Sequence, residues 1–98
     1  MKREELIRTD DARVASIELE SGEVSPWHYH SRVTETIFAL RGEVRLEVGV
    51  DASAITLHPG QRHEVAPGVR HRLSNPGGVH SVYLLVQNGH YDFVAVDA

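Results

Sequence analysis

The chain has 98 residues, 41% of them hydrophobic, and its 14 acidic and 10 basic residues give a formal net charge of −4. This length suits one domain with one core, and the acidic balance argues against a nucleic-acid partner held through phosphates. The absence of cysteine excludes a disulfide framework and a thiolate metal site. No segment approaches the ~20 apolar residues of a membrane span, and the charged start carries no signal-like apolar run. We therefore expect a cytoplasmic protein with no membrane partner.

The first residues are charged, and their structure is ambiguous. Residues 1–8 could form a helical turn, an edge strand or an arm lying on a partner subunit, and no helical periodicity persists beyond them. We expect residues 1–98 to form a single domain, with residues 1–12 as a terminal arm or edge segment.

Short apolar runs follow in regular alternation with turn signals such as Arg41-Gly42, Pro59-Gly60 and Asn88-Gly89. Regularly spaced short strands are typical of an all-β sandwich or barrel. The expected strands lie within residues 14–20, 36–41, 43–48, 54–57, 63–66, 70–74, 80–87 and 91–96.

Two spaced motifs carry the chemistry. The first reads G-x(5)-H-x-H-x(4)-E-x(6)-G from Gly22 to Gly42, and the second reads G-x(7)-G-x(2)-H-x(3)-N from Gly60 to Asn75. Alternate residues of a strand point to the same face, so the two histidines of the first motif can chelate one ion. Three imidazoles and one carboxylate suit a divalent Fe, Mn, Ni, Zn, Co or Cu ion. The candidate metal ligands are His28, His30, Glu35 and His71.

These motifs resemble those of the cupin superfamily. The first motif matches at every defined position, whereas the second has Ala66 in place of the family's proline, with Pro67 one residue later, and Gln61 in place of a common acidic residue. The resemblance implies a single jelly-roll barrel, also called a double-stranded β-helix, which is commonly dimeric and holds the metal near its middle. It does not imply one activity, because similar proteins include dioxygenases, isomerases, lyases, cyclases and non-enzymatic binding proteins.

Strand alternation predicts which side chains face the metal. If Glu35 points inward, so do Ile37 and Ala39, whereas Phe38 and Leu40 point outward. By the same rule, Val24 and Pro26 share a face with the paired histidines, and Trp27 and Tyr29 take the opposite face. An outer face carrying Trp27, Phe38 and Leu40 would expose an apolar patch, so we expect a homodimer. Alternatively, the chain's own terminal segments cover these side chains.

Two further assignments depend on parity. In residues 80–87 either Val82, Leu84 and Val86 or Ser81, Tyr83 and Leu85 face inward, and we prefer the first set because it gives an apolar wall. The expected wall residues are Ile37, Ala39, Val44, Leu46 and Leu84. His63 shares parity with Val65 and is a candidate proton-transfer group beside the metal, although an exposed strand histidine is the plainer interpretation.

The leading functional hypothesis is a metal-dependent enzyme acting on a small organic molecule inside the barrel. The three histidines would hold the ion, while Glu35 would bind it and could also act as a catalytic base. A dioxygenase is the specific version if O2 binds, and an isomerase, lyase or cyclase is expected otherwise. The alternative is a non-catalytic small-ligand or metal-binding protein.

Overall fold

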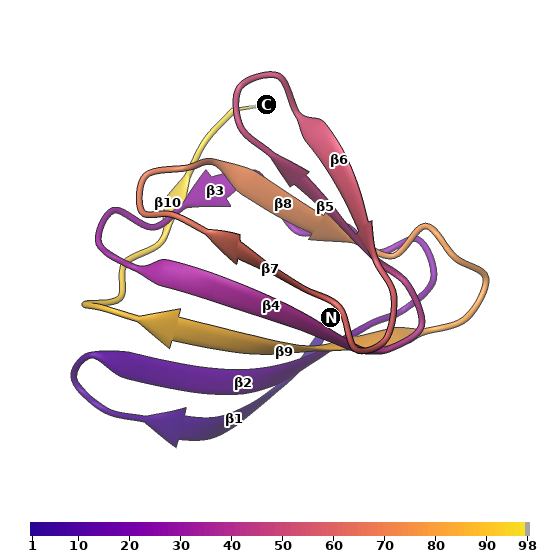
Figure 1. Cartoon of the computed structure of the whole chain (residues 1–98), viewed down its shortest axis with the longest axis horizontal. Helices are drawn as coiled ribbons and strands as arrows, with labels where there is room; N and C mark the ends of the chain where they lie inside the picture. Colours follow the sequence, from indigo (N-terminus) through magenta and orange to yellow (C-terminus); the bar gives the residue numbers. More distant parts are fainter. Residues whose placement is uncertain (98) are drawn as a thin grey trace.

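The computed structural model describes residues 1–97, and these form ten β-strands and no helix. The strands pack as two five-stranded sheets, in the orders β1-β2-β9-β4-β7 and β10-β3-β8-β5-β6 (Figure 1). The strands are β1 (Lys2–Arg8), β2 (Ala12–Leu19), β3 (His28–Tyr29), β4 (Thr34–Arg41), β5 (Val44–Val48), β6 (Ser53–Leu57), β7 (Arg62–Val65), β8 (His71–Ser74), β9 (Ser81–Asn88) and β10 (Val94–Ala95).

All named strand pairs are antiparallel. Strands that follow one another in the sequence often belong to different sheets, so the chain crosses repeatedly from one sheet to the other. This confirms the predicted all-β, jelly-roll fold. Apolar side chains fill the space between the sheets, because each strand turns alternate residues inward. The buried core consists of Ala15, Ile17, Leu19, Ile37, Ala39, Val44, Leu46, Leu57, Val65, Leu73, Tyr83 and Leu85. Within the described residues, no helix is long and apolar enough to cross a membrane.

Strand β4 has the predicted parity. Glu35, Ile37 and Ala39 are buried, whereas Phe38 is half-buried and Leu40 is 52% exposed. One carboxylate therefore shares an inward row with apolar side chains, which is the arrangement expected of a metal ligand on a core strand. The prediction succeeds because an inward Glu35 fixes the parity of every other residue on the strand.

Strand β9 has the opposite parity to the preferred one. Glu35 lies directly across from Gln87, which places Gln87, Leu85, Tyr83 and Ser81 inside the barrel and Leu84 outside it. The prediction that Leu84 lines the inner wall is therefore wrong. Both alternating sets of β9 are rich in apolar residues, so only the pairing register with β4 decides between them.

Residues 24–27 do not form a strand, and the parity prediction fails there. Val24 makes a single bridge to Ser74 and is 51% exposed, and Pro26 is also exposed. Trp27 is only 7% exposed, because the guanidinium groups of Arg70 and Arg72 lie 4.5 and 5.0 Å from the ring centroid. Trp27 is thus not part of an outer apolar patch, and its partners come from the second motif.

Each end of the chain forms an edge strand of one sheet. Residues 2–8 form β1, an edge strand paired with β2, rather than a helical turn. The strand predicted within residues 91–96 is confined to β10, which pairs with β3. The preceding residues, Tyr91 to Phe93, lie against the histidines instead of continuing a ladder.

Candidate metal centre

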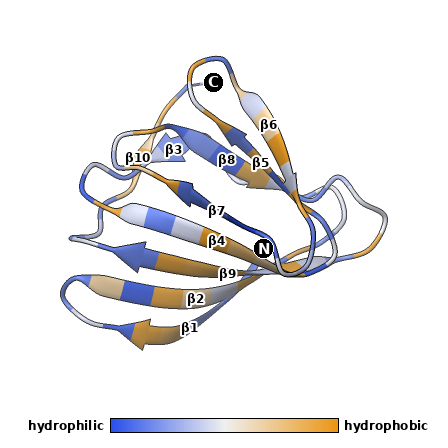
Figure 2. Cartoon of the chain, viewed as in Figure 1, coloured by the Kyte–Doolittle hydropathy of each residue, from blue (hydrophilic) through white to orange (hydrophobic). Residues whose placement is uncertain are grey.

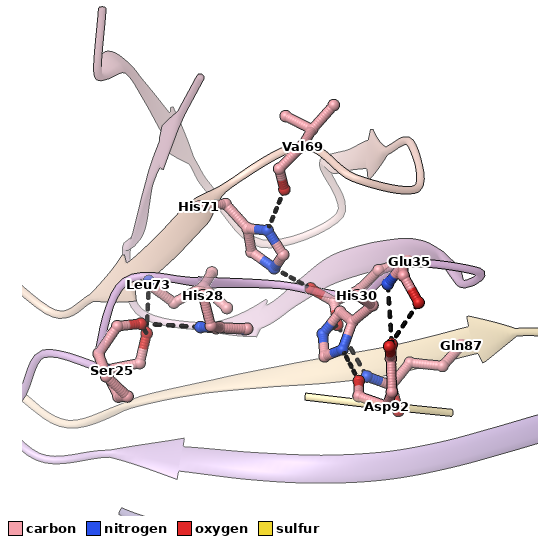
Figure 3. A network of polar contacts seen from close by, with 11 residues as sticks. Ser25, His28, His30, Glu35, Val69, His71, Leu73, Gln87 and Asp92 are labelled. Carbon is pink, nitrogen blue, oxygen red and sulfur yellow. Dashed lines mark hydrogen bonds and ion pairs between the residues drawn. The ribbon is translucent and has the colours of Figure 1, made fainter. Parts of the chain in front are cut away.

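Four side chains from three strands meet between the two sheets. His28 lies on β3, His30 follows that strand directly, Glu35 lies on β4 and His71 on β8. One ligand atom from each lies within 4.8 Å of the others, and all four residues are buried. Because β3 pairs with β8, His28 stands directly across from His71, so the two sequence motifs join in one site. The predicted ligands therefore come together in space (Figure 3).

The backbone holds all three imidazole rings in the same tautomer. The Nδ1 atoms of His28, His30 and His71 lie 2.7, 2.5 and 2.9 Å from the carbonyl oxygens of Pro26, Asp92 and Val69, respectively. A carbonyl oxygen can only accept, so each Nδ1 carries the proton and donates it. Nε2 is then the nitrogen of each ring that is left to face the cluster, as in metal-binding histidines whose other nitrogen is held by a hydrogen bond.

The carboxylate of Glu35 lies at the centre of this cluster. Its Oε2 is 2.7 Å from Nε2 of His71, and its Oε1 accepts a 2.8 Å hydrogen bond from Nε2 of Gln87. Nε2 of His30 lies 3.1 Å from Oε1, yet it is buried and makes no aligned hydrogen bond with any described residue. A buried ring nitrogen without an aligned partner and a converging carboxylate fit a divalent ion with nitrogen and oxygen ligands.

Burial and mutual proximity shift the pKa values of these groups in different directions. Burial lowers the pKa of His28, because the charged imidazolium loses solvation. Burial also opposes the charge on His30, but the nearby Glu35 carboxylate and the Asp92 carbonyl outweigh it and raise the pKa of His30. Burial disfavours the Glu35 anion too, but the two neighbouring histidines more than compensate and lower its pKa strongly. Glu35 therefore remains ionised at neutral pH.

Gln87 was missed by the sequence interpretation, because a lone glutamine at a strand end carries no metal-binding signal. Its amide orients the central carboxylate, since Nε2 donates to Glu35 and its side chain is buried. We predict that Gln87→Leu weakens metal affinity by about 10- to 100-fold, as expected when a group that orients a ligand is lost. Competition with a chromophoric chelator measures this, with exposed Gln61→Leu as the control. Equal affinities of the two variants would contradict the orienting role.

The segment from Tyr91 to Phe93, which follows β9, lies against two of the histidines, and we call it the aromatic strap. The ring of Phe93 stacks on His28 with centroids 4.6 Å apart, and the ring of Tyr91 lies 5.4 Å from that of His30. Arg13 covers the Tyr91 ring at 3.8 Å, and both Oγ and the backbone N–H of Ser31 donate to the Asp92 carboxylate. Two aromatic residues spaced two apart near the chain end were the only sequence signal for this strap.

A cavity of about 160 Å³ opens beside the cluster. Its wall is mainly apolar, which is typical of sites that bind small organic molecules. The polar groups reaching it include Tyr83, whose pKa is raised by burial and then by the Glu35 carboxylate, so its hydroxyl stays protonated. The residues that line this cavity are Met1, Arg3, Ile17, Ser25, Pro26, His28, His30, Glu35, Leu73, Tyr83, Leu85, Gln87, Tyr91 and Phe93.

The other histidines do not join the cluster. His63 is half-buried on β7, directly across from Ile37, and lies outside both the four-ligand cluster and the cavity. Its proton-transfer role remains a prediction. His58, His80 and His90 are exposed, as expected for histidines without ligand spacing.

Comparison with known proteins identifies the family. The family model described as "Cupin domain" matches residues 15–87, so the chain belongs to the cupin family. The TT1209 protein of Thermus thermophilus is 22% identical with a TM-score of 0.84, and the match covers 91% of this chain and 83% of that one. No curated protein matches the sequence at a significant level.

Two further solved structures share the fold. An uncharacterized conserved protein with a double-stranded β-helix domain from Klebsiella pneumoniae is 21% identical with a TM-score of 0.88, over 99% of this chain and 84% of that one. A recombinant oxalate oxidase in complex with glycolate is 18% identical with a TM-score of 0.80, over 96% of this chain and 54% of that one. At these identities the likeness concerns the fold alone.

Proposed function

We propose that the protein holds one divalent transition-metal ion on His28, His30, Glu35 and His71 and catalyses a reaction of a small organic molecule in the adjoining cavity. One observation carries the proposal: three Nδ1-anchored imidazoles turn their Nε2 atoms toward one buried carboxylate. Such an ion would supply Lewis acidity or a site for O2, which gives isomerase-, lyase- or cyclase-type chemistry in the first case and a dioxygenase in the second.

The chain's own residues supply the remaining requirements of such a reaction. Gln87 holds Oε1 of Glu35, while Oε2 faces His71, so the carboxylate can bind an ion through one oxygen and take up a proton at the other. The inner apolar side chains of Ile17, Leu73 and Leu85 exclude water from the cavity. Glu35 is the candidate base, because it is the one carboxylate among the described residues that line the cavity.

Metal loading followed by activity screening tests this proposal. Protein prepared without a nickel column is loaded separately with iron, manganese, cobalt, nickel, copper and zinc, and bound metal is measured by mass spectrometry. Each loaded form is then screened for O2 consumption and for turnover of small organic acids, beside Glu35→Gln. Stoichiometric metal with turnover that falls in the variant supports the enzyme, whereas failure to take up any of these ions refutes it.

Metal affinity should fall as pH decreases, since the ion competes with protons for the imidazole nitrogens. The pKa of His30 is raised above its ordinary 6.5, so His30 is protonated first on acidification, whereas His28, whose pKa is lowered, stays neutral longer. We predict that, as the pH is lowered, the apparent Zn²⁺ affinity begins to fall while the pH is still above about 6.5. Chelator competition between about pH 8 and about pH 5.5 measures this. A constant affinity over that range would contradict the assignment.

We also propose a homodimer formed through the outer face of sheet β1-β2-β9-β4-β7. Phe38 and Leu84 stand directly across from one another on that face, with Val86 beside them, and β9 is hydrophobic along much of its length (Figure 2). We predict that Leu84→Glu lowers the mass measured by light scattering from that of a dimer to that of a monomer. Thr56→Glu on exposed β6 is the control. A monomeric wild-type protein at micromolar concentration would refute the dimer.

A non-catalytic binding protein is the second candidate, and the strap favours it. Phe93 stacks on His28, and Tyr91 lies over His30, so two of the ligands are covered from the side of the C-terminal segment. A metal-loaded protein with no exchangeable water or solute on the ion would support this alternative, because catalytic sites keep an open position.

A further inference from the structure

The cavity carries polar groups that metal binding does not explain. Arg3 on β1 stands across from Ile17 on β2, and Ile17 stands across from Tyr83 on β9. Directly opposed residues of antiparallel strands point to the same face. Arg3, although on an exposed edge strand, therefore shares the inner face with buried Ile17 and Tyr83, and both Arg3 and Tyr83 line the cavity.

These two groups are donors without protein acceptors. Among residues 1–97, no carboxylate forms an ion pair with Arg3, and Tyr83 lines the cavity without a charged partner. A guanidinium can only donate, and a tyrosine hydroxyl on a cavity wall can donate to a group bound there. A bound anion would satisfy both groups, and a carboxylate matches the planar fork of arginine.

A third group, the side-chain amide of Gln87 beside the candidate ligands, has an acceptor atom without a donor. Gln87 must present its Nε2 to Glu35, because a carboxylate only accepts, so the orientation of its amide is determined. Its Oε1 is then buried with no donor among the described residues. Gln87 and Tyr83 are four residues apart on the inner face of β9, with Leu85 between them, so acceptor and donors line the same cavity.

We propose that this cavity binds a short hydroxycarboxylate, with its carboxylate held by Arg3 and Tyr83 and its hydroxyl donating to Gln87 beside the metal ligands. The proposal rests on the proposed function, because it names the substrate class of the same site. The cavity of about 160 Å³ holds roughly five water volumes of about 30 Å³ each, which restricts the ligand to a few carbons. Ile17, Leu73, Leu85 and Phe93 provide apolar contacts for its chain.

Calorimetric titration of the full-length protein, both metal-free and metal-loaded, tests the assignment. The probes are glycolate, lactate and gamma-hydroxybutyrate, each beside its amide and its deoxy acid. Arg3→Gln and Tyr83→Phe remove the two donors with little change in volume. Arg8→Gln, on the same edge strand but outside the cavity, and Tyr29→Phe, on β3, are the matched controls. Thermal unfolding verifies that all four variants are folded.

We expect at least one hydroxy acid to bind about tenfold more tightly than its amide, and also more tightly than its deoxy acid. Arg3→Gln should remove most of the preference for the acid over the amide. Tyr83→Phe should weaken the same acid severalfold, while both controls leave its affinity unchanged. Equal binding of acid and amide, equal losses in the controls, or no binding of any acid would overturn the proposal. If one of these negative results occurs while the protein takes up metal normally, the proposed metal site still stands. If acid binding depends on Arg3 but the protein takes up no metal, only the metal-dependent function is refuted.

Discussion

His71→Ala is expected to abolish stoichiometric metal binding. His71 is the only candidate ligand supplied by the second motif, and its Nε2 lies 2.7 Å from Oε2 of Glu35. Changes in groups that merely orient a ligand already cost about 10- to 100-fold in metal affinity, so loss of a ligand itself should cost more than about 100-fold. Metal content after equilibrium dialysis, measured by mass spectrometry, gives the result directly.

The variant also affects the metal-free protein. His71 is 1% exposed and supports the buried Glu35 carboxylate, so its removal leaves that charge with fewer partners and a void beside it. We expect the free energy of unfolding to fall by roughly 1–3 kcal/mol, the usual cost of leaving a buried polar group unsatisfied. His58→Ala, at an exposed turn, is the control and should change neither quantity. Undiminished metal content in His71→Ala would show that the ion, if bound, is held elsewhere.

Gly89→Ala is expected to have the largest effect on stability. Gly89 joins β9 to the aromatic strap with a φ of +122°, and a Cβ built there would lie 2.1 Å from the carbonyl oxygen of Arg32. This close neighbour is backbone, so it cannot move aside as a flexible side chain would. We expect the free energy of unfolding to fall by more than about 2 kcal/mol, which urea denaturation measures.

The same substitution should also weaken metal binding, since it displaces the chain that positions Asp92. The Asp92 carbonyl accepts the Nδ1 proton of His30, so movement of the strap removes the support of one ligand. Gly78→Ala is the matched control, because a Cβ added there would have no atom within 4 Å and the φ of Gly78 is not positive. A Gly89→Ala protein as stable as Gly78→Ala would show that the loop relaxes without strain.

Much of the candidate site could be predicted from local pattern. The ligand types and spacing gave all four members of the cluster, and the parity of β4 was correct because the candidate ligand Glu35 fixes which face points inward. The strands were recognisable because turn residues interrupt the apolar runs at short intervals. Metal identity and substrate do not follow from such patterns, because several ions share these ligands and many reactions share this fold.

The remaining features depend on contacts between segments far apart in the chain. The inward face of β9 was predicted wrongly because Leu84 and Leu85 are equally apolar, and only the pairing of Gln87 with Glu35 decides between them. Trp27 is buried by two arginines from the second motif, distant in the chain, which no local pattern indicates.

The sequence by itself thus determined an all-β chain with a candidate set of four metal ligands, since alternation and ligand spacing are local properties. Only the tertiary structure decided how that set is held and what lies beside it. Gln87 on Glu35, the strap on His28 and His30, and Arg3 across the sheet from Tyr83 all arise from strand register and chain closure. Register is a property of paired strands, so a single strand's sequence specifies it weakly when both of its faces are apolar.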